Sequence, residues 1–206
     1  MFGGWHDVFI RLAAMVAVGA AVKLMDDYLD AEFDLCLGKR TLAARWGRAT
    51  LPYALVLALI GCSLDRTLAV SLFFGSYAVG MLSQFAERMP TRVPAYVEMA
   101  LAFMTSVLLA GWRSALWGVA MMAVIDWLDD FMDRLPDKQS GQRNLAVRIG
   151  TVETLMLMLI ALCIAVLCDG MDTAIAFVAA VLLYAAAEWT TTCRRHVPND
   201  DGVSVG

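Results

Sequence analysis

The hydrophobic positions of the chain form long apolar runs that are separated by short polar segments. These runs are close to the length of a helix that crosses a bilayer, which is about 20 residues. The chain is therefore expected to be an all-α, polytopic membrane bundle in one domain (1–189), followed by a flexible polar tail (190–206). The pattern predicts seven transmembrane helices, at about residues 8–25, 49–64, 67–85, 94–110, 115–128, 151–167 and 173–189.

The composition favours a membrane protein over a soluble helical bundle. Hydrophobic residues make up 60% of the 206 residues, and the mean hydropathy is +0.66, above the usual range for soluble domains. The five cysteines include no C-x-x-C pair, so neither a disulfide nor a zinc site is expected. The net charge of −4 lies mostly in loops, and no basic stripe suggests a nucleic-acid partner.

Two acidic segments follow apolar runs and share one spacing, with an offset of 103 residues. The match continues without a gap into the basic segments that come next. We interpret it as an internal duplication, with repeats at about 8–86 and 111–189 joined by a helix at 94–110. The identical pairs are Asp26/Asp129, Asp27/Asp130, Asp30/Asp133, Asp34/Asp137, Gly38/Gly141, Arg40/Arg143, Leu42/Leu145, Ala43/Ala146, Arg45/Arg148 and Gly47/Gly150.

The predicted topology places both acidic segments on one side of the membrane. Four helices separate the first from the second, so the two segments emerge on the same face. Of the 16 lysines and arginines, twelve lie on that face, two (Arg66 and Arg113) lie on the other, and Arg11 and Lys23 fall within the first helix. The positive-inside rule then predicts that the acidic segments and the C-terminus are cytoplasmic and that the N-terminus is outside. We expect an integral protein of a bacterial or archaeal cytoplasmic membrane.

The spacing of the aspartates indicates a cation site. Asp27, Asp30 and Asp34 are three and four residues apart, so they share one face of a helix end. Like charges so close together repel each other, which calls for a compensating positive group. Carboxylate oxygens suit Mg²⁺, whose octahedron is often completed by waters and substrate phosphates.

These motifs resemble those of the UbiA-type intramembrane prenyltransferases. The segment from Asp26 to Asp34 fits the family's N/D-D-x-x-D-x-x-x-D pattern at every fixed position. Asp133, Asp137, Gly141 and the run 144–150 resemble its second motif. The chain is shorter than most members, and Arg40-Thr41-Leu42 stands where an Arg-Pro element is usual. The resemblance implies that the protein ionises an allylic isoprenyl diphosphate and transfers the prenyl group to a lipophilic acceptor.

The resemblance also implies roles for individual residues. The catalytic carboxylates would be Asp27, Asp30, Asp34, Asp130, Asp133 and Asp137, and these together with Asp26 and Asp129 would hold Mg²⁺. Cations in the two basic segments are placed to bind diphosphate oxygens, which guanidinium groups pair bidentately. They are Lys39, Arg40, Arg45, Lys138, Arg143 and Arg148.

Other interpretations remain open at this point. The same ionisation could cyclise a prenyl diphosphate, or the chain could bind isoprenoid lipid without catalysis. A CDP-alcohol phosphotransferase is disfavoured because its D-G-x-x-A-R start is absent. Lys23 either neutralises a neighbouring carboxylate or extends toward the interface. Glu98 and Glu188 lie in apolar segments, where a charge is either functional or close to an interface.

Overall fold

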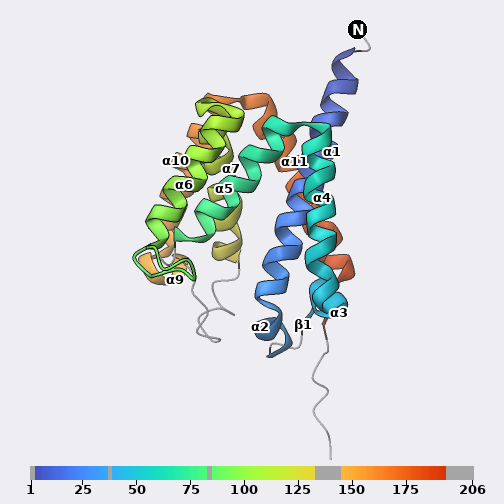
Figure 1. The fold of residues 1–206 in the computed structure, drawn as a ribbon, viewed down its shortest axis with the longest axis vertical. Helices are drawn as coiled ribbons and strands as arrows, with labels where there is room; N and C mark the ends of the chain where they lie inside the picture. Colours follow the sequence, from blue (N-terminus) through green and yellow to red (C-terminus); the bar gives the residue numbers. More distant parts are fainter. Residues whose placement is uncertain (1–2, 37–38, 83–84, 133–144, 194–206) are drawn as a thin grey trace, which may run out of the picture.

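The computed structural model describes residues 3–36, 39–82, 85–132 and 145–193, and the statements below concern these residues. The chain is almost entirely helical (Figure 1). The elements are α1 (Gly3–Leu29), α2 (Ala31–Cys36), β1 (Lys39–Arg40), α3 (Leu42–Trp46), the 3-10 turn η1 (Gly47–Ala49), α4 (Thr50–Leu64), α5 (Arg66–Gly80), α6 (Ala95–Ala110), α7 (Trp112–Met132), α9 (Leu145–Ile149), α10 (Thr151–Cys168), α11 (Gly170–Thr190) and β2 (Thr192–Cys193).

Every predicted apolar run is a helix. The observed bounds differ from the predicted bounds at the acidic ends of α1 and α7. The helix predicted to end near residue 25 continues to Leu29, and the one predicted to end near 128 continues to Met132. In α1, Lys23 compensates acids three and four residues later, which permits the helix to continue through them. The helix predicted for 67–85 ends earlier, at Gly80.

Four helical segments of the described chain are long and apolar enough to cross a membrane: 4–29, 42–64, 151–168 and 170–190. The other long helices depart from this standard. α5 and α6 have 15 and 16 residues, below the ~20 needed for a full crossing. α7 is long enough but carries Arg113 and several aspartates. Large apolar side chains face outward, as at Leu108 and Leu167, which are each 79% exposed. The protein is therefore a helical membrane protein.

Two helices form the centre of the bundle. α1 packs mainly against α4 and α11, whereas α7 packs mainly against α5 and α10. The largest fully buried side chains are Trp117 and Met121 of α7, which lie in one cluster with Met15 and Val18 of α1. α5 and α7 pack so closely at Gly75 that a Cβ added there would lie 2.6 Å from the backbone of α7. Figure 1 shows the C-terminal ends of α1 and α7 at the same end of the bundle.

The corners at the opposite end of the bundle are built alike. Asp65 joins α4 to α5 with φ −147° and ψ 100°, and Asp169 joins α10 to α11 with φ −155° and ψ 104°. Each aspartate side chain accepts a hydrogen bond from the backbone N–H three residues later, at Leu68 (3.0 Å) and Asp172 (2.9 Å). This is the usual N-cap arrangement, in which a side-chain oxygen satisfies a free donor of the first turn.

A short strand pair brings the end of the chain back to the first basic segment. β1 and β2 are antiparallel, with Lys39 opposite Cys193 and Arg40 opposite Thr192. The helical part ends at Thr190, where the predicted tail begins. Residues 194–206 of that tail lie outside the described residues.

Candidate functional site

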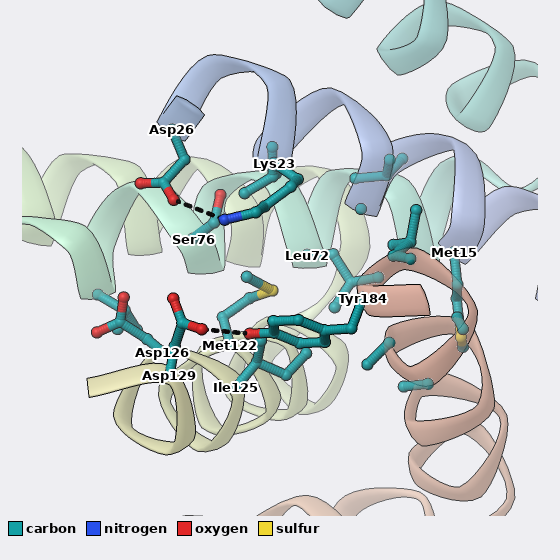
Figure 2. A pocket seen from close by; sticks show the side chains of 18 of the residues that line it. Met15, Lys23, Asp26, Leu72, Ser76, Met122, Ile125, Asp126, Asp129 and Tyr184 are labelled. Atoms are coloured by element: carbon teal, nitrogen blue, oxygen red, sulfur yellow. Dashed lines mark hydrogen bonds and ion pairs between the residues drawn. The ribbon is translucent and has the colours of Figure 1, made fainter. Parts of the chain in front are cut away.

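A pocket of about 170 Å³ opens between α1, α5, α7 and α11. Its inner wall is apolar, with side chains that include Met15, Val18, Leu72, Met122 and Ile125. Its polar side chains gather at the end where the acidic parts of α1 and α7 converge (Figure 2). We name this end the polar mouth, and it consists of Lys23, Asp26, Asp126, Asp129 and Tyr184.

The α1 side of the polar mouth is a lysine between two carboxylates. Lys23 Nζ lies 3.1 Å from Asp27 Oδ1 and 3.6 Å from Asp26 Oδ2. The Asp27 side chain is 13% exposed, whereas that of Asp26 is 57% exposed. Helical spacing explains the arrangement, since positions i+3 and i+4 lie on the same face as position i. Lys23 therefore compensates acidic charge, the first of the two roles that the sequence left open.

The α7 side of the polar mouth presents two carboxylates to the pocket. Asp126 and Asp129 are three residues apart on the last turns of α7, and both line the pocket. The Tyr184 hydroxyl of α11 donates a hydrogen bond to Asp129 Oδ1 at 3.1 Å. Figure 2 shows Asp126 and Asp129 across the pocket from Asp26 and Lys23. Charges interact across the pocket: Lys23 attracts Asp129, whereas Asp26 and Asp126 repel each other.

The pocket lining is formally anionic. Three carboxylates and one ammonium give it a formal charge of −2 within the described part of the chain. The acids also lie near the C-terminal ends of α1 and α7, where the helix dipole adds negative potential. The polar mouth is therefore suited to a cation, or to an anion that arrives together with cations.

The structure divides the predicted carboxylates into groups. Asp26 and Asp129 line the pocket, and Asp27 lies beside them in its ion pair with Lys23. Asp130 interacts electrostatically with Asp126, which the motif comparison had not included among the site residues. Asp133 and Asp137 lie outside the described residues.

The remaining acids of the first motif lie just beyond the pocket. Asp30 is at the bend between α1 and α2, and Asp34 is within α2. Partial burial, followed by the charges of Asp26 and Asp34, raises the pKa of Asp30 to about 6. These two carboxylates extend the negative region of the polar mouth without lining the pocket.

The basic-segment cations occupy other places. Arg40 on β1, Arg45 on α3 and Arg148 on α9 are exposed, and none of the three lines the pocket. The side chain of Lys39 is not described, and Lys138 and Arg143 lie outside the described residues. Among the described residues, Lys23 is the cation that lines the pocket, and the sequence analysis had assigned it no diphosphate contact.

Two further mouth residues were missed as site residues. Asp126 occupies the position equivalent to Lys23 under the 103-residue offset, so the aligned repeats carried a signal for it. Tyr184 lies on α11 outside both motifs, and nothing in its spacing indicated a role. By contrast, Glu98 is buried and accepts a hydrogen bond from Tyr77 at 2.7 Å, and Glu188 is exposed.

The donor chemistry suits Mg²⁺ that arrives with a phosphate ligand. Within the described ranges, no group of three or more His, Cys, Asp or Glu side chains is arranged to hold a metal ion by itself. Mg²⁺ commonly uses one or two carboxylates and completes its shell with waters and substrate phosphates. Asp26, Asp126 and Asp129 offer such carboxylates from two helices. The fit is to a metal–phosphate complex rather than to a protein-only cage.

Comparisons with protein-family models, with curated proteins and with solved structures found no match to this chain.

Proposed function

We propose that the protein is a Mg²⁺-dependent intramembrane prenyltransferase that acts on an allylic isoprenyl diphosphate. The observation that carries the proposal is the convergence of two acidic helix ends on one apolar pocket in a membrane bundle. An isoprenyl diphosphate matches this pocket, because its anionic head would bind metal at the polar mouth and its apolar chain would contact the apolar wall. The resemblance of both aspartate motifs to the UbiA type supports the same reaction.

The residues of the polar mouth would bind and orient the diphosphate. Asp26 and Asp129, with Asp27 and Asp130 beside them, would hold Mg²⁺ at the pocket entrance. When bound, Mg²⁺ would neutralise the charge that builds up on the departing diphosphate. The C1–O bond of the substrate breaks with its electron pair on the diphosphate, and a new bond forms between C1 and the acceptor. The acceptor loses a proton to the aqueous side of the polar mouth.

The apolar wall would protect the reactive carbon from water. Met122 and Ile125 of α7 and Leu72 of α5 surround the inner part of the pocket. A cavity of about 150 Å³ holds one benzene-sized group, so the observed 170 Å³ fits the first isoprene unit of a chain. The rest of a longer chain would extend between helices toward the lipid.

We further infer that the chain is a parallel duplication with seven membrane segments and a cytoplasmic polar mouth. Similar corner geometry at Asp65 and Asp169 supports the duplication, with a shift of one residue from the 103-residue offset of the motifs. So does the packing, because the third helix of each half contacts the first helix of the other half: α11 on α1, and α5 on α7. The excess of basic residues near the acidic motifs supports the orientation.

A direct assay tests the proposed reaction. The purified protein is incubated with labelled farnesyl or geranylgeranyl diphosphate and a lipid extract, with Mg²⁺ or with EDTA. We expect Mg²⁺-dependent pyrophosphate release and a labelled lipid product. Asp27→Ala should lower the rate about 100-fold or more, because several kcal/mol of transition-state stabilisation depend on the metal.

The controls separate the alternatives. Asp7→Ala removes an exposed aspartate at the other end of α1 and should leave the rate unchanged. A labelled product that forms equally well without any acceptor would indicate cyclisation. Binding of the diphosphate without pyrophosphate release would indicate a lipid-binding protein. A rate near wild type in Asp27→Ala would contradict the proposed site.

A further inference from the structure

We propose that Lys23 is a built-in counter-cation that keeps free Mg²⁺ off the first acidic motif until a diphosphate enters the pocket. The inference deepens the function proposed above and depends on it for the identity of the anion. In this proposal, Lys23 couples the binding of metal to the binding of diphosphate.

The position of Lys23 carries the first step. Its ammonium contacts both carboxylates at the start of the first motif, at 3.1 Å and 3.6 Å. The Asp27 side chain is 13% exposed, so water does little to screen this ion pair. Lys23 also interacts electrostatically with Asp129 on the facing helix. The ammonium therefore lies in the negative potential of the C-terminal ends of both α1 and α7.

Competition between cations is the second step. Mg²⁺ binds carboxylate oxygens at 2.0–2.1 Å, so an ion on Asp26 or Asp27 would lie within a few ångströms of the ammonium. The two positive charges would repel each other there. On the α7 side, Asp129 accepts a hydrogen bond from Tyr184 and also interacts electrostatically with Lys23. Lys23 would therefore weaken the binding of free Mg²⁺ most at Asp26 and Asp27, the two carboxylates that it contacts.

A diphosphate would reverse this competition. A lysine ammonium has three donors and no acceptor, and phosphate oxygens accept charge-assisted hydrogen bonds strongly. An anion at the polar mouth would draw Nζ away from Asp26 and Asp27 and leave their oxygens free for Mg²⁺. Mg²⁺ and diphosphate would then bind cooperatively, with Lys23 on the phosphate and the aspartates on the metal.

A purely structural ion pair would behave differently. It would hold α1 together at its end, and its removal would destabilise the protein without changing how Mg²⁺ and diphosphate depend on each other. Binding measurements separate the two roles without recourse to enzyme activity.

The experiment compares wild type with Lys23→Met, using inorganic pyrophosphate as the anion. Thermal unfolding midpoints and Mn²⁺ binding, followed by the paramagnetic signal of free Mn²⁺, are measured with and without pyrophosphate. We expect wild type to respond weakly to Mg²⁺ or Mn²⁺ alone and strongly to metal with pyrophosphate. Lys23→Met should bind metal alone about tenfold more tightly, within the usual range of coupling between sites, and lose the gain from pyrophosphate.

Arg66→Met is the matched control. It removes one positive charge at the opposite end of the bundle, on an exposed residue of α5, and should bind metal as wild type does. Lys23→Gln provides a second variant, and Mg²⁺ during purification should stabilise both Lys23 variants. If neither folds even with Mg²⁺, the proposal is overturned, because the lysine would then be required for folding.

The outcomes separate this inference from the function on which it depends. Strong binding of metal alone by wild type, equal to that of Lys23→Met, would overturn the role of Lys23 and leave the prenyltransferase proposal in place. No response of any variant to metal with pyrophosphate would count against both. An unchanged pyrophosphate effect in Lys23→Met would show that Lys23 only pairs with its neighbours.

Discussion

Both ends of the bundle carry aspartates. At one end they lie at helix N-termini, and at the other they lie at helix C-termini. At the end away from the pocket, Asp65, Asp169 and Asp172 lie at the N-terminal ends of α5 and α11, where the helix dipole favours negative charge. Two of them cap a helix, and the third accepts a hydrogen bond from Arg11. Their positions are explained by the stability of the fold.

At the pocket end, the aspartates lie where a helix disfavours them. Asp26 and Asp27 are in the last turn of α1, and Asp129 and Asp130 are in the last turn of α7. The C-terminal end of a helix carries partial negative charge and favours cations. Lys23 compensates only part of this surplus within the pocket lining. The difference shows that helix position, more than the number of acids, distinguishes a candidate cation site from a structural cluster.

The largest expected effect comes from removing charge on the α7 side of the polar mouth. Asp126→Asn with Asp129→Asn keeps the shape of both side chains and removes two carboxylates from the pocket. We expect Mg²⁺-dependent pyrophosphate release to fall about 100-fold or more. We also expect the unfolding midpoint without Mg²⁺ to stay equal or to rise, because like charges near one another destabilise a site.

Both quantities are measured on the same preparation, by pyrophosphate release and by thermal unfolding. Loss of activity together with a clear loss of stability would mean that these acids are structural and that the comparison between the two ends is wrong. Arg113→Met, at the start of α7, changes charge on the same helix far from the pocket and serves as the control.

At the end of the bundle away from the pocket, we expect a smaller effect, and on stability instead of on activity. Arg11 Nη1 donates to Asp172 Oδ1 at 2.5 Å, and the Asp172 side chain is 8% exposed. Arg11→Met leaves that carboxylate buried without its partner, and breaking a buried ion pair costs about 3–5 kcal/mol. Because Arg11 itself is 41% exposed, solvent screening reduces the expected loss to about 2 kcal/mol.

The measurement is the free energy of unfolding, with Mg²⁺–pyrophosphate binding as the second readout. The double variant Arg11→Met with Asp172→Leu replaces the pair by apolar side chains and should recover most of the lost stability. Mg²⁺–pyrophosphate affinity should match wild type in both variants. A weakened affinity would show that the two ends of the bundle are coupled and that the Arg11–Asp172 pair is not purely structural.

The apolar pattern predicted the helices well because each buries or exposes hydrophobic side chains over its whole length. Thr50–Leu64 and Thr151–Cys168 lie within one or two residues of their predicted bounds. The helices that carry the acidic segments were predicted to end near 25 and 128, four residues short of Leu29 and Met132. In α1 the ion pair of Lys23 supports continuation past Asp27, and that interaction depends on side-chain geometry.

The candidate site was predictable only as far as its residues lie in the repeated motifs. Spacing identified Asp26 and Asp129, and both line the pocket. It could not identify Tyr184, which comes from a helix far along the chain and reaches Asp129 through the packing of α11. Spacing also gave no reason to prefer Lys23 over Arg45 as the cation of the pocket. Which cation faces the cavity depends on how the helices turn toward each other.

The smallest expected effect tests whether the α4–α5 corner and the α10–α11 corner contribute equally to stability. Asp65→Ala and Asp169→Ala each remove one N-cap hydrogen bond, from Leu68 N–H and from Asp172 N–H. A lost cap typically costs about 1 kcal/mol, so both variants should lose about that much in free energy of unfolding. Asp65→Asn and Asp169→Asn retain an accepting oxygen and are the controls, with stability close to wild type.

Equal losses are the informative result, because similar backbone angles at the two corners predict similar energetics. Pyrophosphate release should remain at the wild-type level in all four variants, since neither corner belongs to the pocket lining. A loss several times larger at Asp169 would mean that its neighbours, Asp172 and Arg11, depend on this cap as well. The two corners would then be alike in geometry but unequal in what they support, and the two halves of the proposed duplication would differ at this end as well as at the acidic end.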